Sequence, residues 1–226
     1  MPMKGSGRTS LREIDRFDGG VGWLAYPDER MERASHALVE DGGVWLVDPV
    51  KARGLDDLLS DLGTVRGVVV LLDRHLRDAA ALAREYGVAV HRPSWMSSVD
   101  DDLDAPVDDL EDTLDETGYG VHKLLDRPPV WREAYLYNEE TGTLVVPEAL
   151  GTSTYFRTGV ERIGVHPMLR PFPPTDLLDL DVERVLVGHG EGVHDDATRA
   201  VRDAVRNSRR RTPALYLKTL REFVLG

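Results

Sequence analysis

The stretch that decides the fold is Gly67-Val68-Val69-Val70-Leu71-Leu72-Asp73-Arg74-His75-Leu76-Arg77-Asp78. Its first half is an unbroken apolar run, which predicts a strand covered on both faces. Its second half is a polar loop that begins where the strand ends. Residues 79–86 are rich in helix-forming side chains, and Gly87 suits the C-cap of a helix. We therefore expect a strand, a loop and a helix, followed by a strand that begins at Val88.

Two hairpins and a short helix are expected before this unit. Residues 8–26 contain apolar positions around a Gly19-Gly20 turn, which is typical of a strand pair. Residues 35–39 and 44–47 flank an Asp-Gly turn signal, and the second of these strands ends at the corner Asp48-Pro49. Residues 54–62 place their leucines at helical spacing, so we expect an amphipathic helix there.

The second half of the chain predicts a third hairpin and a helical C-terminus. Residues 131–137 and 143–146 form the hairpin, which ends at Glu148. A strand over residues 182–187 runs into Gly188-His189-Gly190. Two helices, over residues 195–209 and 213–224, follow, because Thr212-Pro213 between them marks a helix start.

Residues 100–116 carry a dense acidic segment. Its ten carboxylates are too crowded to pack internally, so we expect a solvated loop or an exposed helix there. They are Asp100, Asp101, Asp102, Asp104, Asp108, Asp109, Glu111, Asp112, Asp115 and Glu116.

The composition predicts one globular domain over residues 1–226, with residues 1–7 flexible and the C-terminal helices within 195–226. A chain of 226 residues with 41% apolar content can bury a substantial core. The sequence has no apolar run of about 18 residues and no secretion signal, so we expect a soluble cytoplasmic protein with no membrane partner. The absence of cysteine excludes disulfides, thiolate metal ligands and cysteine nucleophiles. Any metal must therefore be held by His, Asp or Glu.

The charge balance is strongly acidic. The chain has 40 Asp and Glu against 28 Lys and Arg, for a net charge of -12, and its only lysines are Lys4, Lys51, Lys123 and Lys218. This bias resembles that of halophilic proteins, because salt at molar concentration screens the self-repulsion of such a surface. An ordinary acidic protein from a genome of high GC content is the alternative. In either case the overall charge disfavours non-specific binding of nucleic acid.

Four segments resemble, in order and spacing, elements of the metallo-β-lactamase superfamily. The first two are the Asp48-Pro49 corner and the loop from Asp73 to Asp78, which stands where that family has a His-x-His-x-Asp-His loop. The third is Pro147-Glu148-Ala149-Leu150-Gly151, and the fourth is Gly188-His189-Gly190. The resemblance spans residues 14–205. It implies an α/β fold, a four-layer αβ/βα sandwich with two mixed sheets.

The same resemblance implies a metal site that this chain has rewritten. Hydrolases of the family hold one or two zinc or iron ions with five histidines and two aspartates, and the metal lowers the pKa of a bound water. In this chain the loop keeps one histidine, His75. Asp73 and Asp78 stand at two other histidine positions, and Arg77 stands at the aspartate position.

Three further family positions lie outside the loop. By the resemblance, Glu148 occupies the place of the bridging aspartate and His189 that of the late histidine. The remaining histidine falls near Pro128-Pro129, where no side chain can ligate a metal, and His122 is only a weak substitute. The candidate pocket therefore comprises Asp48, Asp73, His75, Arg77, Asp78, Glu148 and His189.

Two interpretations of this pocket are open. In the first the site holds no cofactor, because Arg77 replaces the metal and its guanidinium pairs with Asp73, Asp78 or Glu148. In the second one divalent ion, zinc, iron or manganese, is held by two histidines and carboxylates. Its ligands are drawn from His75, Asp78, Glu148 and His189.

The other polar residues have simpler interpretations. His189 between two glycines is also compatible with a plain strand-end turn, and Asp48 before Pro49 with a corner that only sets main-chain hydrogen bonds. His36 and His91 are expected to be surface or satisfied core histidines. His166 and His194 lie in loops, and His194 is close enough in sequence to His189 to line the same cleft.

Three functions are therefore weighed. The first is a non-hydrolytic or strongly impaired metallo-β-lactamase-like protein that binds an unknown small molecule or protein. The second is a mononuclear metal-dependent hydrolase of the thioesterase or lactonase type, which uses His75 and His189. The third is RNA binding by the arginines that follow Arg199, of which Arg202 and Arg206 share its helical face. We expect those arginines to pair with the acidic segment instead, which makes a nucleic-acid partner the weakest of the three.

Overall fold

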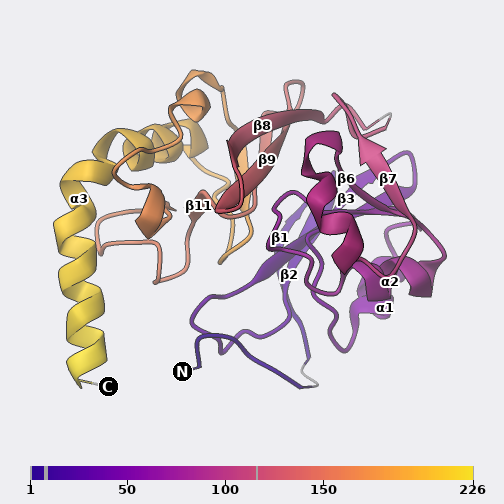
Figure 1. The fold of residues 1–226 in the computed structure, drawn as a ribbon, viewed down its shortest axis with the longest axis horizontal. Coiled ribbons are helices and arrows are strands. Elements are labelled where there is room, and N and C mark those ends of the chain that lie inside the picture. The colour runs from indigo at the N-terminus through magenta and orange to yellow at the C-terminus, as the bar shows by residue number, and fades with distance from the viewer. Residues whose placement is uncertain (1, 8–9, 116, 226) are drawn as a thin grey trace.

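The strands of the protein gather into two large sheets with helices on their outer faces. The computed structural model describes residues 2–7, 10–115 and 117–225. Its layers run in the order helices, sheet, sheet, helix (Figure 1). Both sheets contain parallel and antiparallel pairs. The expected α/β class and the four-layer αβ/βα sandwich with two mixed sheets are therefore confirmed.

The larger sheet contains seven strands in chain order, β1 to β7. Neighbours from β1 to β4 are antiparallel, and neighbours from β4 to β7 are parallel. Both expected N-terminal hairpins are confirmed. The strands are β1 Arg12–Phe17, β2 Gly20–Leu24, β3 Ala34–Glu40, β4 Gly43–Val47, β5 Thr64–Val69, β6 Val90–Pro93 and β7 Val107–Leu110.

The smaller sheet has the order β13-β10-β9-β8. The third hairpin is confirmed, because β9 and β10 are antiparallel neighbours, and β13 joins β10 in parallel. The long strand β8 pairs with β9 and was not expected from the sequence. The strands are β8 Gly120–Arg127, β9 Trp131–Asn138, β10 Thr143–Val146 and β13 Arg184–Val187, and a separate pair is formed by β11 Leu150–Gly151 and β12 Gly164–Val165.

Helices α1 and α2 confirm the two helices expected before and after the buried strand. Gly87 adopts a left-handed conformation with φ 66° and caps α2, as its position predicts. No helix in the described part of the chain is both long and apolar enough to cross a membrane. The helices are α1 Leu55–Ser60, α2 Ala79–Tyr86 and α3 Ala197–Leu225, with three 3₁₀ helices, η1 Ser94–Asp102, η2 Pro167–Leu169 and η3 Thr175–Asp179.

The two separate C-terminal helices expected on either side of Pro213 are a wrong prediction. The structure has a single helix, α3, that contains Pro213 and changes direction along its length (Figure 1). A proline lacks the N–H that would bond four residues back, and its ring crowds that carbonyl, so it bends a helix without having to end it. The Thr212 hydroxyl donates to the Ser208 carbonyl oxygen at 2.9 Å, which adds a side-chain hydrogen bond immediately before the proline.

The acidic segment is also more ordered than expected. It contributes the end of η1 and the edge strand β7, which pairs with β6. The buried Arg92 explains this order, because its guanidinium donates to Asp100 at 2.6 Å and to Asp109. The segment lies at the opposite end of the molecule from α3 (Figure 1). The expected pairing of the α3 arginines with this segment is therefore wrong, and Glu116 lies outside the described residues.

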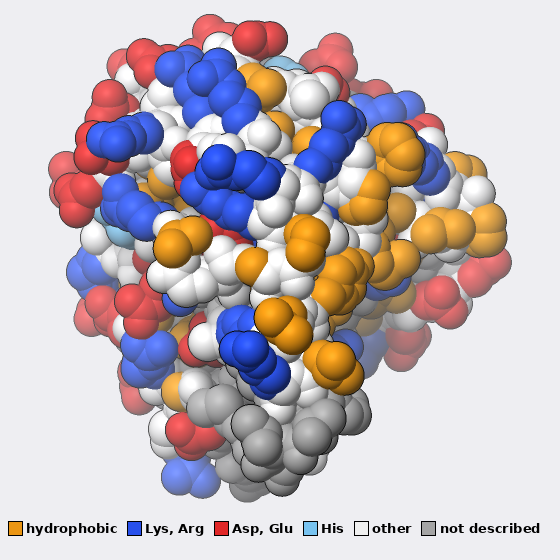
Figure 2. All heavy atoms as spheres, turned by 90° about the vertical axis from the view of Figure 1, so that its left-hand side faces the viewer, with side chains coloured by type: hydrophobic (Ala, Val, Ile, Leu, Met, Phe, Trp, Pro, Cys, Tyr) orange, Lys and Arg blue, Asp and Glu red, His pale blue; other side chains and the backbone are white. Residues whose placement is uncertain are grey.

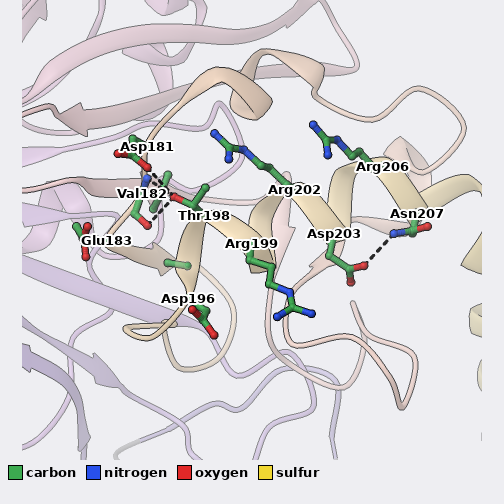
Figure 3. Close-up of a pocket in the computed structure, with 11 residues that line it drawn as sticks. Asp181, Val182, Glu183, Asp196, Thr198, Arg199, Arg202, Asp203, Arg206 and Asn207 are labelled. Atoms are coloured by element: carbon green, nitrogen blue, oxygen red, sulfur yellow. Dashed lines mark hydrogen bonds between the residues drawn. The ribbon is translucent and has the colours of Figure 1, made fainter.

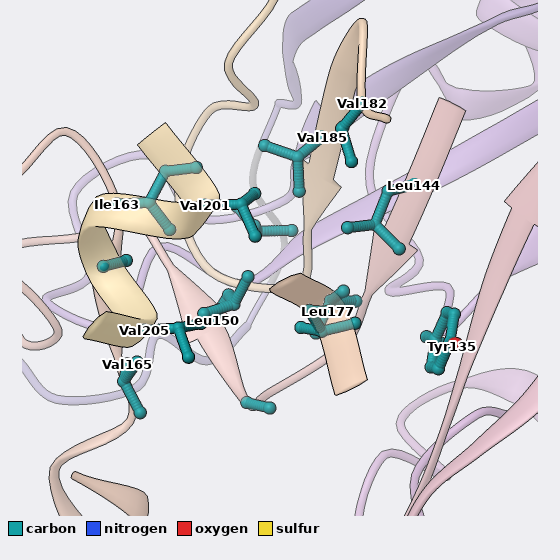
Figure 4. Packing of buried hydrophobic residues seen from close by; sticks show 14 of the residues in the cluster. Tyr135, Leu144, Leu150, Ile163, Val165, Leu177, Val182, Val185, Val201 and Val205 are labelled. Atoms are coloured by element: carbon teal, nitrogen blue, oxygen red, sulfur yellow. The ribbon is translucent and has the colours of Figure 1, made fainter. Parts of the chain in front are cut away.

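Three apolar clusters hold the layers together. One lies between α1, α2 and the larger sheet, and a second lies between the two sheets. The third joins the smaller sheet to α3, where Leu144 and Val185 of the sheet face Val201 and Val205 of the helix (Figure 4). Each sheet is thus buried on both faces, which the unbroken apolar strands of the sequence required.

Truncation of Leu136 tests this sandwich. Leu136 lies on β9, is fully buried and belongs to the cluster between the two sheets. Leu136→Ala should lower the free energy of unfolding by about 2–5 kcal/mol, because it removes buried surface and leaves a cavity. Urea denaturation measures the change. Leu217→Ala, at a side chain that is 49% exposed, is the matched control and should change stability by no more than about 0.5 kcal/mol.

Candidate functional site

The candidate residues meet where strands of both sheets end. Asp48 follows β4, and His75 lies in the loop that leaves β5. Glu148 follows β10, and His189 follows β13. Because β4 and β5 are parallel neighbours, and so are β10 and β13, each pair delivers its following residues to one edge. This edge is the usual position of a ligand site in a sheet with parallel strands.

The centre of the site is Glu148, held between two histidines. Its Oε2 lies 2.8 Å from His75 Nε2 and 3.1 Å from His189 Nε2. Candidate ligand atoms of the three residues lie within 4.8 Å of one another, and among the described residues they form the one group of three His, Cys, Asp or Glu with this spacing. The structure therefore brings together three of the four residues expected as possible metal ligands.

The outer nitrogen of each histidine has its own acceptor. His75 Nδ1 lies 3.2 Å from Asp48 Oδ2, and His189 Nδ1 lies 2.9 Å from the Met31 carbonyl oxygen. Asp48 is itself oriented by the main-chain N–H of Leu71, which donates to Oδ1 at 3.1 Å. Neither acceptor can donate, so each Nδ1 carries a proton and each Nε2 faces Glu148.

The charges of this cluster are strongly coupled. Burial acts to raise the pKa of Glu148, but the close contacts with His189 and His75 outweigh it and hold the pKa well below the ordinary range. Burial lowers the pKa of His189, although Glu148 opposes this change. The carboxylate is therefore ionised, and its negative charge requires a cation nearby.

Arg77 supplies a fixed positive charge beside these residues. Its guanidinium donates to the carbonyl oxygens of Ala34 at 2.5 Å, of Asp48 at 2.7 Å and of Gly188 at 3.1 Å. Its Nη2 lies 3.4 Å from His75 Nε2. The expected pairing of this guanidinium with Asp73, Asp78 or Glu148 is therefore wrong.

Two members of the expected pocket lie apart from this cluster. Asp78 Oδ2 accepts the main-chain N–H of Lys51 at 2.8 Å, so Asp78 is not in the group that could hold a metal. Asp73 Oδ2 accepts the main-chain N–H of Arg132 at 3.1 Å. Both carboxylates therefore accept a main-chain N–H from another segment of the chain. The comparison of this sequence with the family's motif could not distinguish this role from binding of a metal ion.

The comparisons with known proteins support the fold. A scan against protein-family models and a search of curated proteins gave no match. Among solved structures, the DIM-1 metallo-β-lactamase exposed to ceftazidime superposes with a TM-score of 0.61 over 90% of this chain and 100% of its own, at 11% identity. A metallo-β-lactamase from Pontibacter korlensis gives 0.60 over 88% and 100%, also at 11% identity. The chain has the metallo-β-lactamase fold.

The metallo-β-lactamase fold also occurs in a flavodiiron protein from Giardia intestinalis that resembles this chain. That protein gives a TM-score of 0.61 at 14% identity, over 89% of this chain and 60% of its own. Identities of 9–14% carry the arrangement of layers and strands, and they leave the chemistry to the side chains of each protein. The function must therefore be argued from the cluster itself.

His166 is a site residue that the sequence placed only in a loop. Its Nε2 lies 3.3 Å from Glu148 Oε1, and its Nδ1 accepts the main-chain N–H of Met168 at 3.2 Å. Nε2 must therefore carry the proton and donate to Glu148. Burial lowers the pKa of His166 to about 4, so the ring is neutral near pH 7. No spacing pattern links His166 to the other histidines, because this loop is unrelated to the motif segments in sequence.

Glu133 is the second residue that sequence reasoning missed. It is fully buried on β9, and its Oε1 accepts the main-chain N–H groups of Glu148 at 2.8 Å and Ala149 at 2.7 Å. Its Oε2 accepts Trp131 Nε1–H at 2.7 Å. Burial raises the pKa of Glu133 to about 7, although these three donors oppose the change. Glu133 thus positions the segment that carries Glu148.

The remaining histidines lie apart from the cluster. His36 and His194 both contact Asp15, at 3.4 Å and 3.0 Å, so His194 does not join His189. His91 packs edge-on against Trp45. The expectation of satisfied core histidines fits His36, which is buried. His122 is exposed and stacks on a tyrosine, Tyr135, instead of reaching the cluster.

A loop between β2 and β3 closes over the cluster. Besides the Met31 carbonyl on His189, the Glu32 carbonyl oxygen accepts Gly190 N–H at 2.8 Å. The side chain of Glu29 then holds Arg33, and residues 2–5 are joined to this loop by main-chain and side-chain hydrogen bonds. His75, Glu148 and His189 are all less than 9% exposed, so the cluster is largely buried. The flexibility expected for residues 1–7 stays a prediction, and Met1 lies outside the described residues.

The arginines of α3 line a separate surface pocket. Arg202 and Arg206 point to the same side of the helix, whereas Arg199 lies toward Asp196 and Asp203 (Figure 3). Arg202 donates to two main-chain carbonyl oxygens of the η3 region. Lys and Arg side chains gather on this face of the molecule beside exposed hydrophobic side chains (Figure 2). Arg202 and Arg206 thus share a face of α3 as expected, but Arg199 does not, so the basic stripe expected from the sequence is only partly present, and it lies away from the cluster.

The pH dependence of stability should report Glu133. Its pKa in the folded chain, about 7, lies above the ordinary 4.5, so the folded state keeps a proton that the unfolded chain has lost. The stability from this group is full below about pH 4.5 and is lost as the pH rises toward 7, a fall of up to about 3 kcal/mol. In Glu133→Gln this loss of stability should be absent when the free energy of unfolding in urea is measured between about pH 4.5 and pH 7. Glu140→Gln, at an exposed site, should keep the wild-type pH profile.

Proposed function

We propose that this protein is a metal-free binding module with the metallo-β-lactamase fold and not a metal-dependent hydrolase. The observation that carries the proposal is the position of Arg77, whose guanidinium is held by three carbonyl oxygens with its Nη2 at 3.4 Å from His75 Nε2. A permanent cation thus stands beside the atoms that would bind a metal ion.

Charge balance supports this proposal. Asp48 and Glu148 each contribute one negative charge, Arg77 contributes one positive charge, and His166 is neutral near pH 7. One proton beyond those of the neutral histidine rings makes this cluster neutral, and His75 has a carboxylate oxygen at each of its nitrogens. A divalent ion in place of that additional proton leaves the cluster with an excess positive charge, which is unfavourable in a largely buried site.

The repulsion between a metal ion and Arg77 is large. An ion bound to a histidine nitrogen lies about 2.1 Å from it, and so no more than about 5.5 Å from Arg77 Nη2. At an effective dielectric constant of about 20, a divalent ion and a unit charge at that distance repel by about 6 kcal/mol. Glu148 offsets part of this energy, but Arg77 cannot turn away without giving up its carbonyl partners.

Elemental analysis of the purified protein tests the proposal. Zinc, iron and manganese should together fall well below one ion per chain, even when the protein is expressed with metal supplements. Arg77→Asp should gain metal affinity, because it removes the cation and adds a carboxylate at the same position. About one ion per chain in the parent protein would contradict the proposal.

Two further variants control this experiment. Arg74→Asp makes the same substitution at a largely exposed arginine, and it should bind no metal. Arg77→Met removes the charge and adds no ligand, so any metal that it gains reports the loss of repulsion alone. Circular dichroism checks that each variant folds, since the loss of a buried charged partner costs about 3–5 kcal/mol.

A mononuclear metal-dependent hydrolase is the second candidate. It is favoured by the inner contacts of the histidines, because an Nδ1 that donates to an acceptor leaves the Nε2 lone pair free for a metal. If the one additional proton of the cluster lies between His75 and Glu148, His189 Nε2 faces Glu148 Oε2 at 3.1 Å without a hydrogen between them. One ion at His75, Glu148 and His189 would remove this unfavourable contact.

Activity assays separate the two candidates. The hydrolase predicts turnover of a thioester, a lactone or a phosphodiester that is lost, by more than about a hundredfold, in both His75→Ala and His189→Ala. His122→Ala, which alters an exposed histidine, should keep full turnover. If none of the substrate classes is turned over by the metal-supplemented parent protein, only the binding module stands.

A further inference from the structure

A charged cavity adjoins the largely buried cluster on the side of residues 189–193. It has a volume of about 400 Å³, near the lower end of the range for small-molecule sites. Its wall shares a backbone segment with the cluster, because the Thr152 hydroxyl donates to the carbonyl oxygen of Glu191 at 2.5 Å and lies 3.4 Å from that of His189. The lining residues are Arg12, Glu32, Thr152, Arg157, Arg162, Glu191, Gly192 and Val193.

Three guanidinium groups from separate parts of the chain converge on this cavity. Arg12 comes from β1, and Arg157 and Arg162 come from the loop between β11 and β12. Arg12 forms an ion pair with Glu191 at the rim, so that pair is internally neutral. Of the remaining charges, only Glu32 opposes the other two arginines, which leaves one excess positive charge.

Arg157 has unused hydrogen-bonding capacity. Its Nε is buried and has no hydrogen-bond partner among the described residues, and its Nη1 makes one long bond, of 3.4 Å, to the Arg162 carbonyl oxygen. A buried donor without a partner is destabilising, so groups of this kind commonly face a ligand or an ordered water.

Glu32 is held in place by the loop that closes the cluster. Its backbone has a φ of 45°, a conformation that a glutamate rarely adopts, and its carbonyl oxygen accepts the N–H of Gly190. Its side chain is half-buried and interacts electrostatically with Arg12 and Arg157. The cavity is therefore lined both by the loop between β2 and β3, through Glu32, and by the segment that follows His189.

We infer that this cavity binds a small molecule with a carboxylate or phosphate group, and that Arg157 and Arg162 hold this anionic group. The inference rests on the proposed function, because it names the ligand class of the binding module. Planar guanidinium groups match the oxygen pairs of carboxylate and phosphate. Glu32 selects ligands that also carry a hydrogen-bond donor, since a fully anionic face would be repelled by its carboxylate.

A titration followed by ¹H–¹⁵N NMR tests the inference. Inorganic phosphate, whose hydroxyl can donate to Glu32, and β-alanine, which joins a carboxylate to an ammonium donor, are the two probes, each added to chelator-treated protein at constant ionic strength. We expect saturable shifts, centred on the amides of Thr152, Gly192 and Val193, from at least one probe. The probe that binds more tightly identifies the phosphate or the carboxylate as the preferred group.

Variants assign the contact. Arg157→Gln and Arg162→Gln should each weaken binding by about tenfold or more, because a charged hydrogen bond is lost. Arg206→Gln removes the same charge on α3, outside this cavity, and should bind like the parent protein. The absence of saturable shifts with both probes, shifts centred elsewhere, or unchanged binding in both cavity variants would each overturn the inference.

The outcome is independent of the metal test. If the parent protein holds a metal ion but the cavity binds an anion as described, the proposed function fails and the site stands. If no metal is found and neither probe binds, the inference fails and the metal-free cluster stands. Should a cavity variant not fold, the location of the shifts in the parent protein still decides the question.

Discussion

The site depends on one interaction, the contact of the Arg77 guanidinium with three main-chain carbonyl oxygens. Ala34 begins β3, Asp48 follows β4, and Gly188 follows β13, so a single side chain joins the ends of strands from both sheets. Main-chain carbonyl groups buried at strand ends need donors, and a guanidinium supplies several in one plane. Arg77 therefore stabilises the same edge at which the fold would place a ligand.

This arrangement decides the chemistry of the neighbouring residues. Burial lowers the pKa of Arg77, but Asp48 and Glu148 oppose this change, and a guanidinium stays charged near pH 7. With this cation in place, the negative charges of Asp48 and Glu148 need only one additional proton for balance. His75 lies between these two carboxylates, while His166 and Glu133 hold Glu148 from its other sides. In the proposed metal-free state, the residues that could hold a metal ion form a hydrogen-bonded network instead. The loop over Met31 adds to this network, because the Met31 carbonyl oxygen accepts from His189 Nδ1.

The closure of the cluster moves the open, ligand-accessible space to the adjoining cavity. The segment from His189 to Val193 is a wall of both, and the strained backbone of Glu32 belongs to the loop that covers one and lines the other. A structure with the metallo-β-lactamase fold can in this way keep its scaffold while a different set of side chains contacts the ligand. A shared fold at 11% sequence identity is compatible with a different set of ligand-binding side chains. Packing of the layers constrains the size and polarity of core side chains but does not constrain the catalytic groups.

The sequence by itself determined the layers and the motif segments. Unbroken apolar strands and turn signals predicted the strands and hairpins, since these features depend on local periodicity. The resemblance of four segments to the metallo-β-lactamase superfamily implied the sandwich and the meeting of His75, Glu148 and His189. The sequence could not determine which acceptors Arg77 would choose, because carbonyl oxygens carry no sequence signal. For the same reason His166 and Glu133 were missed, and Asp78 was grouped with ligands although it binds the N–H of Lys51. Only the tertiary structure decided those contacts, because they join segments that are far apart in the chain and meet only when both sheets have packed.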